Sequence, residues 1–278
     1  MTYASEPSNL SSLNRRCNNL EGNDQLSVTR RQNLMALVVV GQLLPEGVAK
    51  GGSAMALRYG AEARFTSDFD ATRRRAESEF KEQFANRLEE GWCGFTGVLK
   101  QLPAPVPRGV PGEYVMTPFE IKLQFRGKSW KTVKFELGHD EVGGAEAGER
   151  MMSEDLAVLF TDLGFPEPGP VKVMRAENQI AQKLHAATCP GSDRAHDLID
   201  LQLLLSNEDI DFVLARELCV RTFRYRRGHA WPPKVTENES WKTVYEAAAD
   251  ELGPDAKVGD LSEAITWTRR LIDKIDRA

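Results

Sequence analysis

Residues 50–70 read KGGSAMALRYGAEARFTSDFD, and this stretch decides the expected fold. A glycine turn is followed by a short helix and then by a strand that carries Asp68 and Asp70. Carboxylates at positions i and i+2 of a strand point to the same face. Mg²⁺ binds one or two carboxylates together with substrate phosphates, and glycines let backbone N–H groups approach phosphate closely. The stretch therefore predicts a site for a nucleoside triphosphate and its metal.

Four residues of the same region are candidates for binding the nucleotide, namely Lys50, Gly52, Ser53 and Arg64. Cations neutralise phosphate charge, and Gly-Gly-Ser at the start of a helix suits an anion. Good helix formers follow at 54–57, so we expect Ser53 to be the N-terminal residue of the helix. The alternative is an ordinary turn with a helix cap, and Asp-x-Asp pairs also occur on solvated turns.

The chain has 278 residues and an ordinary composition, with 41% hydrophobic and 28% charged residues. It is long enough for one large or two modest domains. With a net charge of −5, any RNA contact must come from local patches. Four cysteines without a C-x-x-C pair argue against a zinc site or a disulfide framework and favour the reducing cytoplasm. The most apolar run, 34–44, is too short to cross a bilayer, so we expect no membrane contact.

The pattern along the chain changes in the Gly- and Glu-rich stretch 140–150. We expect a polar and loosely ordered segment over 1–27, a domain of strands and helices over 28–148, and a mainly helical C-terminal domain over 149–278. The expected elements are helices over 28–45, 72–90, 177–188, 208–223, 239–251 and 261–277, strands over 94–99, 114–125 and 131–137, and a loop over 103–111.

Spacing draws attention to three more polar residues. In the last predicted strand Glu136 faces away from the apolar side, where it either joins Asp68 and Asp70 as a third carboxylate or is simply exposed. Lys183 lies at the margin of the apolar stripe of one predicted helix, and Asp197 heads the inward row of the next. These two residues form a structural ion pair or project into a cleft shared with the first half, and the spacing favours neither.

Two arginine-rich segments are candidates for RNA contacts. Residues 73–75 are three consecutive arginines, and residues 221–227, RTFRYRR, interleave aromatic and guanidinium groups. Aromatic rings beside phosphate-binding cations suit single-stranded or terminal nucleotides. The alternative for both segments is a solvated helix face with packed aromatics.

Four motifs, in this order, resemble those of the AbiEii/AbiGii-type nucleotidyltransferase toxins. They are residues 50–70, KFEL at 134–137, AQKLHA at 181–186 and RAHDLIDL at 194–201. The chain departs from the family pattern at Gln182, where Glu is usual, and at His196 and Ile199, where a basic residue and a tyrosine are usual. The resemblance implies an α+β, bilobed protein: a polymerase-β-like nucleotidyltransferase domain with a mixed sheet, followed by the mainly helical domain.

The resemblance also implies roles for the motif residues. Asp68 and Asp70 would hold Mg²⁺ or Mn²⁺, with Glu136 as a further metal ligand. Lys183 would neutralise charge on the triphosphate of the NTP. Asp197 is the acid of the fourth motif, which would orient Lys183, complete the metal site or act as a base.

The activity implied by the resemblance is that of a toxin of a toxin–antitoxin pair, which transfers NMP from an NTP to an acceptor and releases pyrophosphate. In some relatives the acceptor is the 3′ end of tRNA, so that translation stops, and a cognate antitoxin protein is the implied partner. Three alternatives remain open: transfer to a protein side chain, transfer to a small molecule, and a non-catalytic module that binds RNA or a partner protein.

Overall fold

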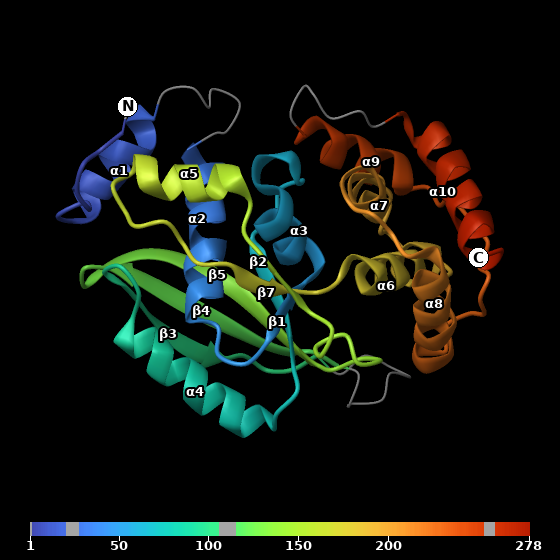
Figure 1. Ribbon diagram of the computed structural model, residues 1–278, viewed down its shortest axis with the longest axis horizontal. Helices are drawn as coiled ribbons and strands as arrows, with labels where there is room; N and C mark the ends of the chain where they lie inside the picture. Colours follow the sequence, from blue (N-terminus) through green and yellow to red (C-terminus); the bar gives the residue numbers. More distant parts are fainter. Residues whose placement is uncertain (1, 21–27, 106–114, 253–258) are drawn as a thin grey trace. The chain divides into compact units, whose positions relative to one another are not determined.

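The computed structural model describes residues 2–20, 28–105, 115–252 and 259–278 (Figure 1). The chain divides into two compact units. Unit 1 consists of Met1–Ala61, Phe65–Asp140 and Ala145–Val173, and unit 2 of Glu62–Arg64, Glu141–Gly144 and Met174–Ala278. Unit 1 thus extends beyond the boundary expected at 148, because two strands that follow this residue pair with its sheet.

Unit 1 is built on a mixed sheet of seven strands within the described ranges, in the order β3-β4-β5-β2-β1-β7-β6. The strands are β1 (Val48–Lys50), β2 (Asp68–Arg73), β3 (Phe95–Gln101), β4 (Thr117–Phe125), β5 (Lys128–His139), β6 (Glu149–Met151) and β7 (Val171–Val173). The central strand β2 is parallel to β5 and antiparallel to β1. A mixed sheet combined with helices confirms the expected α+β class.

The described part of unit 1 contains five α-helices: α1 (Leu10–Asn19), α2 (Val28–Leu43), α3 (Gly51–Tyr59), α4 (Glu77–Glu90) and α5 (Glu154–Asp162). Every residue of α2 from Met35 to Val40 is at most 1% exposed, as expected for a helix that is apolar all round. Phe80 and Phe84 of α4 pack on Phe135 of β5, with ring centroids 6.3 and 5.1 Å apart. This apolar layer covers one side of β5 and leaves its polar residues to the other side.

Helix α1 corrects the expectation that the start of the chain is loosely ordered. Its N-cap residue Asn9 accepts a hydrogen bond from the backbone N–H of Ser12 at 2.9 Å. Leu13 and Cys17 are fully buried in the core of unit 1. A polar segment can therefore contribute an ordered helix when two of its apolar residues share one face. Residues 1 and 21–27 of this segment lie outside the described residues.

Unit 2 is helical in its described part. Its helices are α6 (Ala176–Thr188), α7 (His196–Asn207), α8 (Phe212–Arg226), α9 (Trp241–Asp250) and α10 (Leu261–Asp276). Helix α6 packs against α7 and α8, and α10 packs against α7, α8 and α9. Side chains fix two of the helix starts: Asp211 caps α8, and Asp260 forms a capping box with Glu263 at the start of α10.

Most of the expected elements are present, with shifted ends. The helix expected over 72–90 begins only at Glu77, because β2 continues to Arg73. The sequence patterns did not predict the three-residue strands β1, β6 and β7 or helix α5. Residues 106–111 of the expected loop and residue 114 of the expected strand lie outside the described residues. Within the described ranges, no helix is both long and apolar enough to span a bilayer.

Candidate active site

The two acids of the first motif lie on the central strand β2, where they alternate with buried residues. Asp68 and Asp70 are half-buried, whereas Phe69 and Ala71 between and after them are fully buried. The period-two geometry of the strand therefore puts both carboxylates on the face opposite the apolar layer. The hydroxyl of Ser67 donates a hydrogen bond to Asp68 Oδ1 at 2.9 Å.

The strand register places two more candidate residues beside Asp70. Lys50 of β1 is its partner on one side, and Glu136 of β5 is its partner on the other. Residues in register on neighbouring strands share a face, so the three residues form a row across the sheet. Glu136 is exposed, whereas Lys50 is only 7% exposed. The side chain of Lys50 lies along the sheet and reaches Gly138 of β5. Its Nζ is 2.9 Å from the position that a Cβ atom on Gly138 would occupy.

Helix α3 begins beside Asp70, two residues earlier than expected. The helix starts at Gly51 with Lys50 as N-cap, so Ser53 is its third residue and not its first. The φ angle of Gly51 is +58°, and a Cβ at this position would overlap Asp70 Oδ2. Glycine is therefore required at residue 51 both for its backbone angle and for the close approach of the carboxylate.

The hydroxyl of Ser53 is fully buried and bonds to the backbone on both sides of the turn. Its Oγ donates to the carbonyl oxygen of Lys50 at 2.8 Å and accepts from the N–H of Asp70 at 3.1 Å. These bonds tie the start of α3 to the strand of the acids. The side chain of Ser53 thus holds the turn in place, while its backbone remains the part of the residue suited to binding phosphate.

Lys183 of α6 lies in a buried cluster of charged residues in unit 2. Its Nζ is 3.0 Å from Asp197 Oδ1 and 2.5 Å from Asp200 Oδ2, and both acids belong to α7. Lys183 is 4% exposed and both acids are fully buried. Of the two interpretations of Lys183 and Asp197, the ion pair is thus present in the structure.

Two arginines complete this cluster. The Nε of Arg194 is 2.7 Å from Asp197 Oδ2, and the Nη2 of Arg64 is 3.1 Å from Asp200 Oδ2. Burial opposes the charge of Arg64, but Asp200 and Asp197 outweigh burial and raise the pKa of Arg64. Arg64 is therefore held as a cation by the acids of α7.

Burial and the nearby cations together shift the pKa values of Asp197 and His196. Burial alone would raise the pKa of Asp197, but Lys183 and Arg194 outweigh it and lower the pKa well below the usual range. Burial, assisted by Arg64, lowers the pKa of His196 to about 4. An acid that is buried, ionised and bonded through both oxygens is a poor proton acceptor, so the geometry favours Asp197 as the residue that orients Lys183.

Our sequence analysis did not assign a role to Asp200 or Arg194. Asp200 follows Asp197 by three residues, and residues at i and i+3 of a helix share a face. This spacing indicates that Asp200 faces the same partner as Asp197, and it is the sequence signal that could have identified Asp200. Arg194 precedes the helix and gave no comparable signal.

The donor set of β2 fits a hard divalent cation. Mg²⁺ typically takes one or two protein carboxylates and completes its shell with substrate phosphates and water, and Asp68 and Asp70 supply two half-exposed carboxylates on one face. Among the residues that the structure describes, no group of three or more His, Cys, Asp or Glu side chains is gathered closely enough to hold a metal ion. The role of Glu136 as a third ligand stays a prediction.

The arginine-rich segments differ from the expected RNA surfaces. Each of the three arginines at 73–75 pairs with a glutamate. In the second segment Phe223 is buried against His185, His229 and Trp231, so its ring is not exposed for stacking on a base. The part of the hypothesis that needed an exposed Phe223 is therefore wrong, while Arg224 remains exposed.

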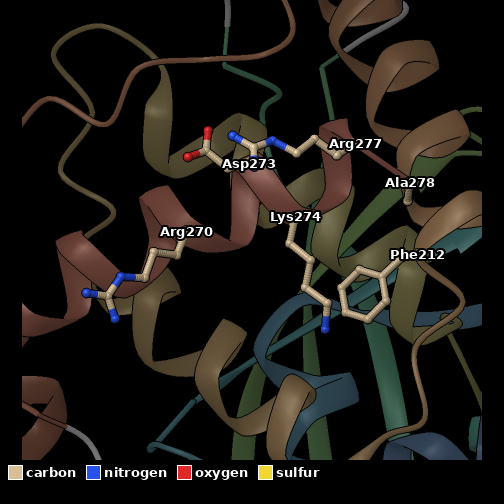
Figure 2. A pocket seen from close by; sticks show the side chains of 6 residues that line it. All are labelled: Phe212, Arg270, Asp273, Lys274, Arg277 and Ala278. Carbon is tan, nitrogen blue, oxygen red and sulfur yellow. The ribbon is translucent and has the colours of Figure 1, made fainter.

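A groove of about 510 Å³ lies along α10 in unit 2. Figure 2 shows its lining side chains, Phe212, Arg270, Asp273, Lys274, Arg277 and Ala278. The ammonium of Lys274 lies 3.8 Å from the centre of the Phe212 ring. None of the predicted site residues lines this groove, which makes Lys274 a suitable control for substitutions of Lys183.

Comparison with known proteins defines first the class of fold and then the family. The chain is similar to the solved structure of MenT4, a nucleotidyltransferase toxin from Mycobacterium tuberculosis H37Rv, with a TM-score of 0.52 and 16% identity over 96% of this chain and 97% of that one. This likeness shows a nucleotidyltransferase fold. Residues 43–268 match the family described as nucleotidyl transferase AbiEii toxin, type IV toxin–antitoxin system. The chain belongs to this family of toxins.

Two further comparisons add little. An antigenic nucleotidyltransferase-like protein from Paracoccidioides brasiliensis has a TM-score of 0.38 with 18% identity, over 87% of this chain and 94% of that one, which is too low to support an inference. No curated protein sequence matches the chain.

Proposed function

We propose that this protein is a metal-dependent nucleotidyltransferase that moves NMP from an NTP to an acceptor hydroxyl, foremost the 3′ end of tRNA in the cytoplasm. The acceptor oxygen bonds to the α-phosphorus, the bond from this phosphorus to the pyrophosphate oxygen breaks, and the hydroxyl proton is released. Membership of the AbiEii family supports nucleotidyl transfer as the class of reaction. A tRNA blocked at its 3′ end cannot be charged, and translation would stop.

The observation that carries the proposal is the alternation on β2. Asp68 and Asp70 are half-exposed on the face opposite the apolar layer, next to the start of α3. A bound Mg²⁺ or Mn²⁺ would neutralise charge on the phosphates and on the leaving pyrophosphate. Asp68 and Asp70 are the proposed ligands, with Glu136 as a further one, and the backbone at Gly52 and Ser53 is proposed to bind phosphate beside Lys50.

The charged cluster of unit 2 supports a second part of the proposal. Lys183 and Arg64 are cations held by Asp197 and Asp200, so they are preorganised before a substrate binds. Preorganised cations stabilise the charge that develops at phosphorus in the transition state. We propose that these cations and the acids of β2 act on the same nucleotide. Their convergence on one substrate remains a prediction.

The test is transfer of labelled nucleotide. The purified protein is incubated with each α-labelled NTP, Mg²⁺ and total tRNA, and label on RNA is measured. We expect label on tRNA from the wild type and a loss of about 100-fold or more in Asp68→Ala and in Lys183→Ala, the scale of removing one electrostatic stabiliser. Lys274→Ala, which removes an exposed lysine from the α10 groove, should retain full activity.

The remaining outcomes separate the alternatives. Label on protein alone would identify a side chain as the acceptor, and label on a small molecule would identify that class. Binding of RNA without any label transfer would indicate a non-catalytic module. In cells, we expect expression of the active protein to arrest growth unless a cognate antitoxin is also present. Normal growth during high expression of the active protein would contradict the assignment as a translation-blocking toxin.

A further inference from the structure

Asp200 is a buried acid to which the sequence patterns assign no role. It lies on α7, three residues after Asp197, and both acids are fully buried. Residues with this spacing share one face of a helix, and here the shared face carries the carboxylates to Lys183 of α6. The ammonium of Lys183 is therefore held at two points by the same helix.

Among the residues that the structure describes, the side-chain hydrogen bonds of Asp200 all fall on one oxygen. Its Oδ2 accepts from Lys183 Nζ at 2.5 Å and from Arg64 Nε at 3.2 Å, and Arg64 Nη2 lies 3.1 Å from the same atom. Its Oδ1 is buried and has no hydrogen-bond partner in the described part of the chain. Buried acceptors without a partner are rare. Because only Oδ2 is hydrogen-bonded, the two cations determine the orientation of this carboxylate.

Asp197 is bonded differently. Both of its oxygens are bonded: Oδ1 accepts from Lys183 Nζ at 3.0 Å and from Arg194 Nη2 at 3.5 Å, and Oδ2 accepts from Arg194 Nε at 2.7 Å. The two acids thus share Lys183, but each also binds a different arginine. Asp200 is the acid that brings an ammonium and the guanidinium of Arg64 to a single oxygen atom.

This arrangement has a consequence for the geometry of the cations. Lysine has a flexible four-carbon stem, and its charge is well placed only when partners hold it. Two like charges next to each other repel, and a fully buried carboxylate between them compensates this repulsion. Without the charge of Asp200, Lys183 and Arg64 would lose the common point that fixes their separation.

We propose that Asp200 is a positioning residue for nucleotidyl transfer, which holds Lys183 and Arg64 together so that both cations meet the polyphosphate of the NTP. The inference rests on the proposed function, because it assigns the cluster to the same reaction. Asp200 acts through the two cations and does not itself contact the nucleotide.

The test uses Asp200→Asn in the full-length protein. The amide has nearly the same shape as the carboxylate, and its oxygen can still accept from one cation while the negative charge is lost. The first measurement is the labelling of Lys183 by acetic anhydride, followed by mass spectrometry of its peptide. We expect labelling to increase several-fold, because one of the two anchors of a 4% exposed ammonium is weakened.

The second measurement is kcat/KM for the NTP, expressed per folded molecule after thermal unfolding has been recorded. We expect a fall of about 10- to 100-fold, the scale of one hydrogen bond to a charged group. Asp200→Glu keeps the charge and should recover part of the loss, and it serves as the second variant if Asp200→Asn folds poorly. Asp209→Asn, which removes an exposed acid just after α7, should change neither labelling nor kcat/KM.

Each result decides the matter. Unchanged labelling of Lys183 in Asp200→Asn would overturn the inference, and so would increased labelling with an unchanged kcat/KM, since Asp200 would then be only structural. An active wild type together with a fully active Asp200→Asn refutes the inference and leaves the proposed function intact. A wild type that transfers nucleotide to no acceptor refutes the proposed function, and the positioning role falls with it.

Discussion

The protein contains two pairs of aspartates in opposite environments. Asp68 and Asp70 alternate on strand β2 and are half-exposed, whereas Asp197 and Asp200 share a face of helix α7 and are fully buried. Lys183 bonds to both acids of the helix pair. The helix pair thus fixes the protein's own cations, whereas the strand pair is the one that we propose to bind a metal ion from solution.

Burial explains why the two pairs cannot exchange roles. An ionised carboxylate without a partner is very unfavourable inside a protein, so the helix pair can exist only with Lys183 and the two arginines around it. A half-exposed carboxylate keeps part of its hydration and can give it up when a metal binds. We therefore expect the helix pair to dominate stability and the strand pair to dominate metal-dependent activity.

The largest expected effect is a difference in stability between Asp197→Ala and Asp68→Ala. Removal of Asp197 takes one of its two acids from the buried ammonium of Lys183 and should lower the free energy of unfolding by about 3–5 kcal/mol. Removal of Asp68, which accepts a hydrogen bond from Ser67, should lower it by about 1 kcal/mol or less. Urea unfolding monitored by circular dichroism measures both. Similar losses in the two variants would contradict the comparison.

The second prediction concerns the pH dependence of stability near the helix pair. Burial lowers the pKa of His196 to about 4, below its ordinary value of 6.5 in the unfolded chain. Between these values the unfolded chain binds more protons, so stability falls as the pH drops from about 6.5 to about 4. After allowance for partial exposure, we expect His196 to contribute about 2 kcal/mol to this fall. In His196→Gln the free energy of unfolding should change less over this range, and an unchanged slope would show that His196 does not contribute.

The sequence predicted the acids of the strand pair better than the contacts of the helix pair. Alternation along β2 is a local property, so the shared face of Asp68 and Asp70 followed from their spacing alone. The contact of Asp200 with Arg64 could not be predicted, because Arg64 is 136 residues away in the chain and precedes a strand of the other unit. The long helices α2 and α6 were recognised, while β1 and β7, with three residues each, are too short to show a period. Ser53 was expected at a helix start, and its buried bonds to β2 are tertiary contacts that spacing does not reveal.

The third prediction tests the close approach of Asp70 to the glycine turn. In Gly51→Ala the new Cβ would overlap Asp70 Oδ2 and the φ of +58° would be strained, so we expect a loss of about 1–2 kcal/mol and lower transferase activity. The matched control is Gly127→Ala, because Gly127 has a φ of +74° with nothing within 4 Å of a new Cβ. Gly127→Ala should lose only the stability that corresponds to its strained backbone angle, and it should keep its activity. Equal activity of the two variants would show that the approach to Asp70 does not matter for the reaction.

The smallest expected effect distinguishes two roles of Ser53. If its hydroxyl bound the triphosphate, Ser53→Ala would raise KM for the NTP and leave stability unchanged. Because the hydroxyl is fully buried and bonded to Lys50 and Asp70, we instead expect a loss of about 1 kcal/mol in stability, a lower kcat and little change in KM.

Thr268→Val is the matched control for Ser53→Ala. It removes another fully buried hydroxyl, which bonds to the carbonyl oxygen of Ala264 within α10. The control should lose similar stability without any loss of kcat, so that a fall in kcat specific to Ser53→Ala can be assigned to the position of Asp70. If Ser53→Ala raises KM alone, the hydroxyl leaves its backbone partners when the nucleotide binds, and the strand pair is then less rigidly held than the helix pair.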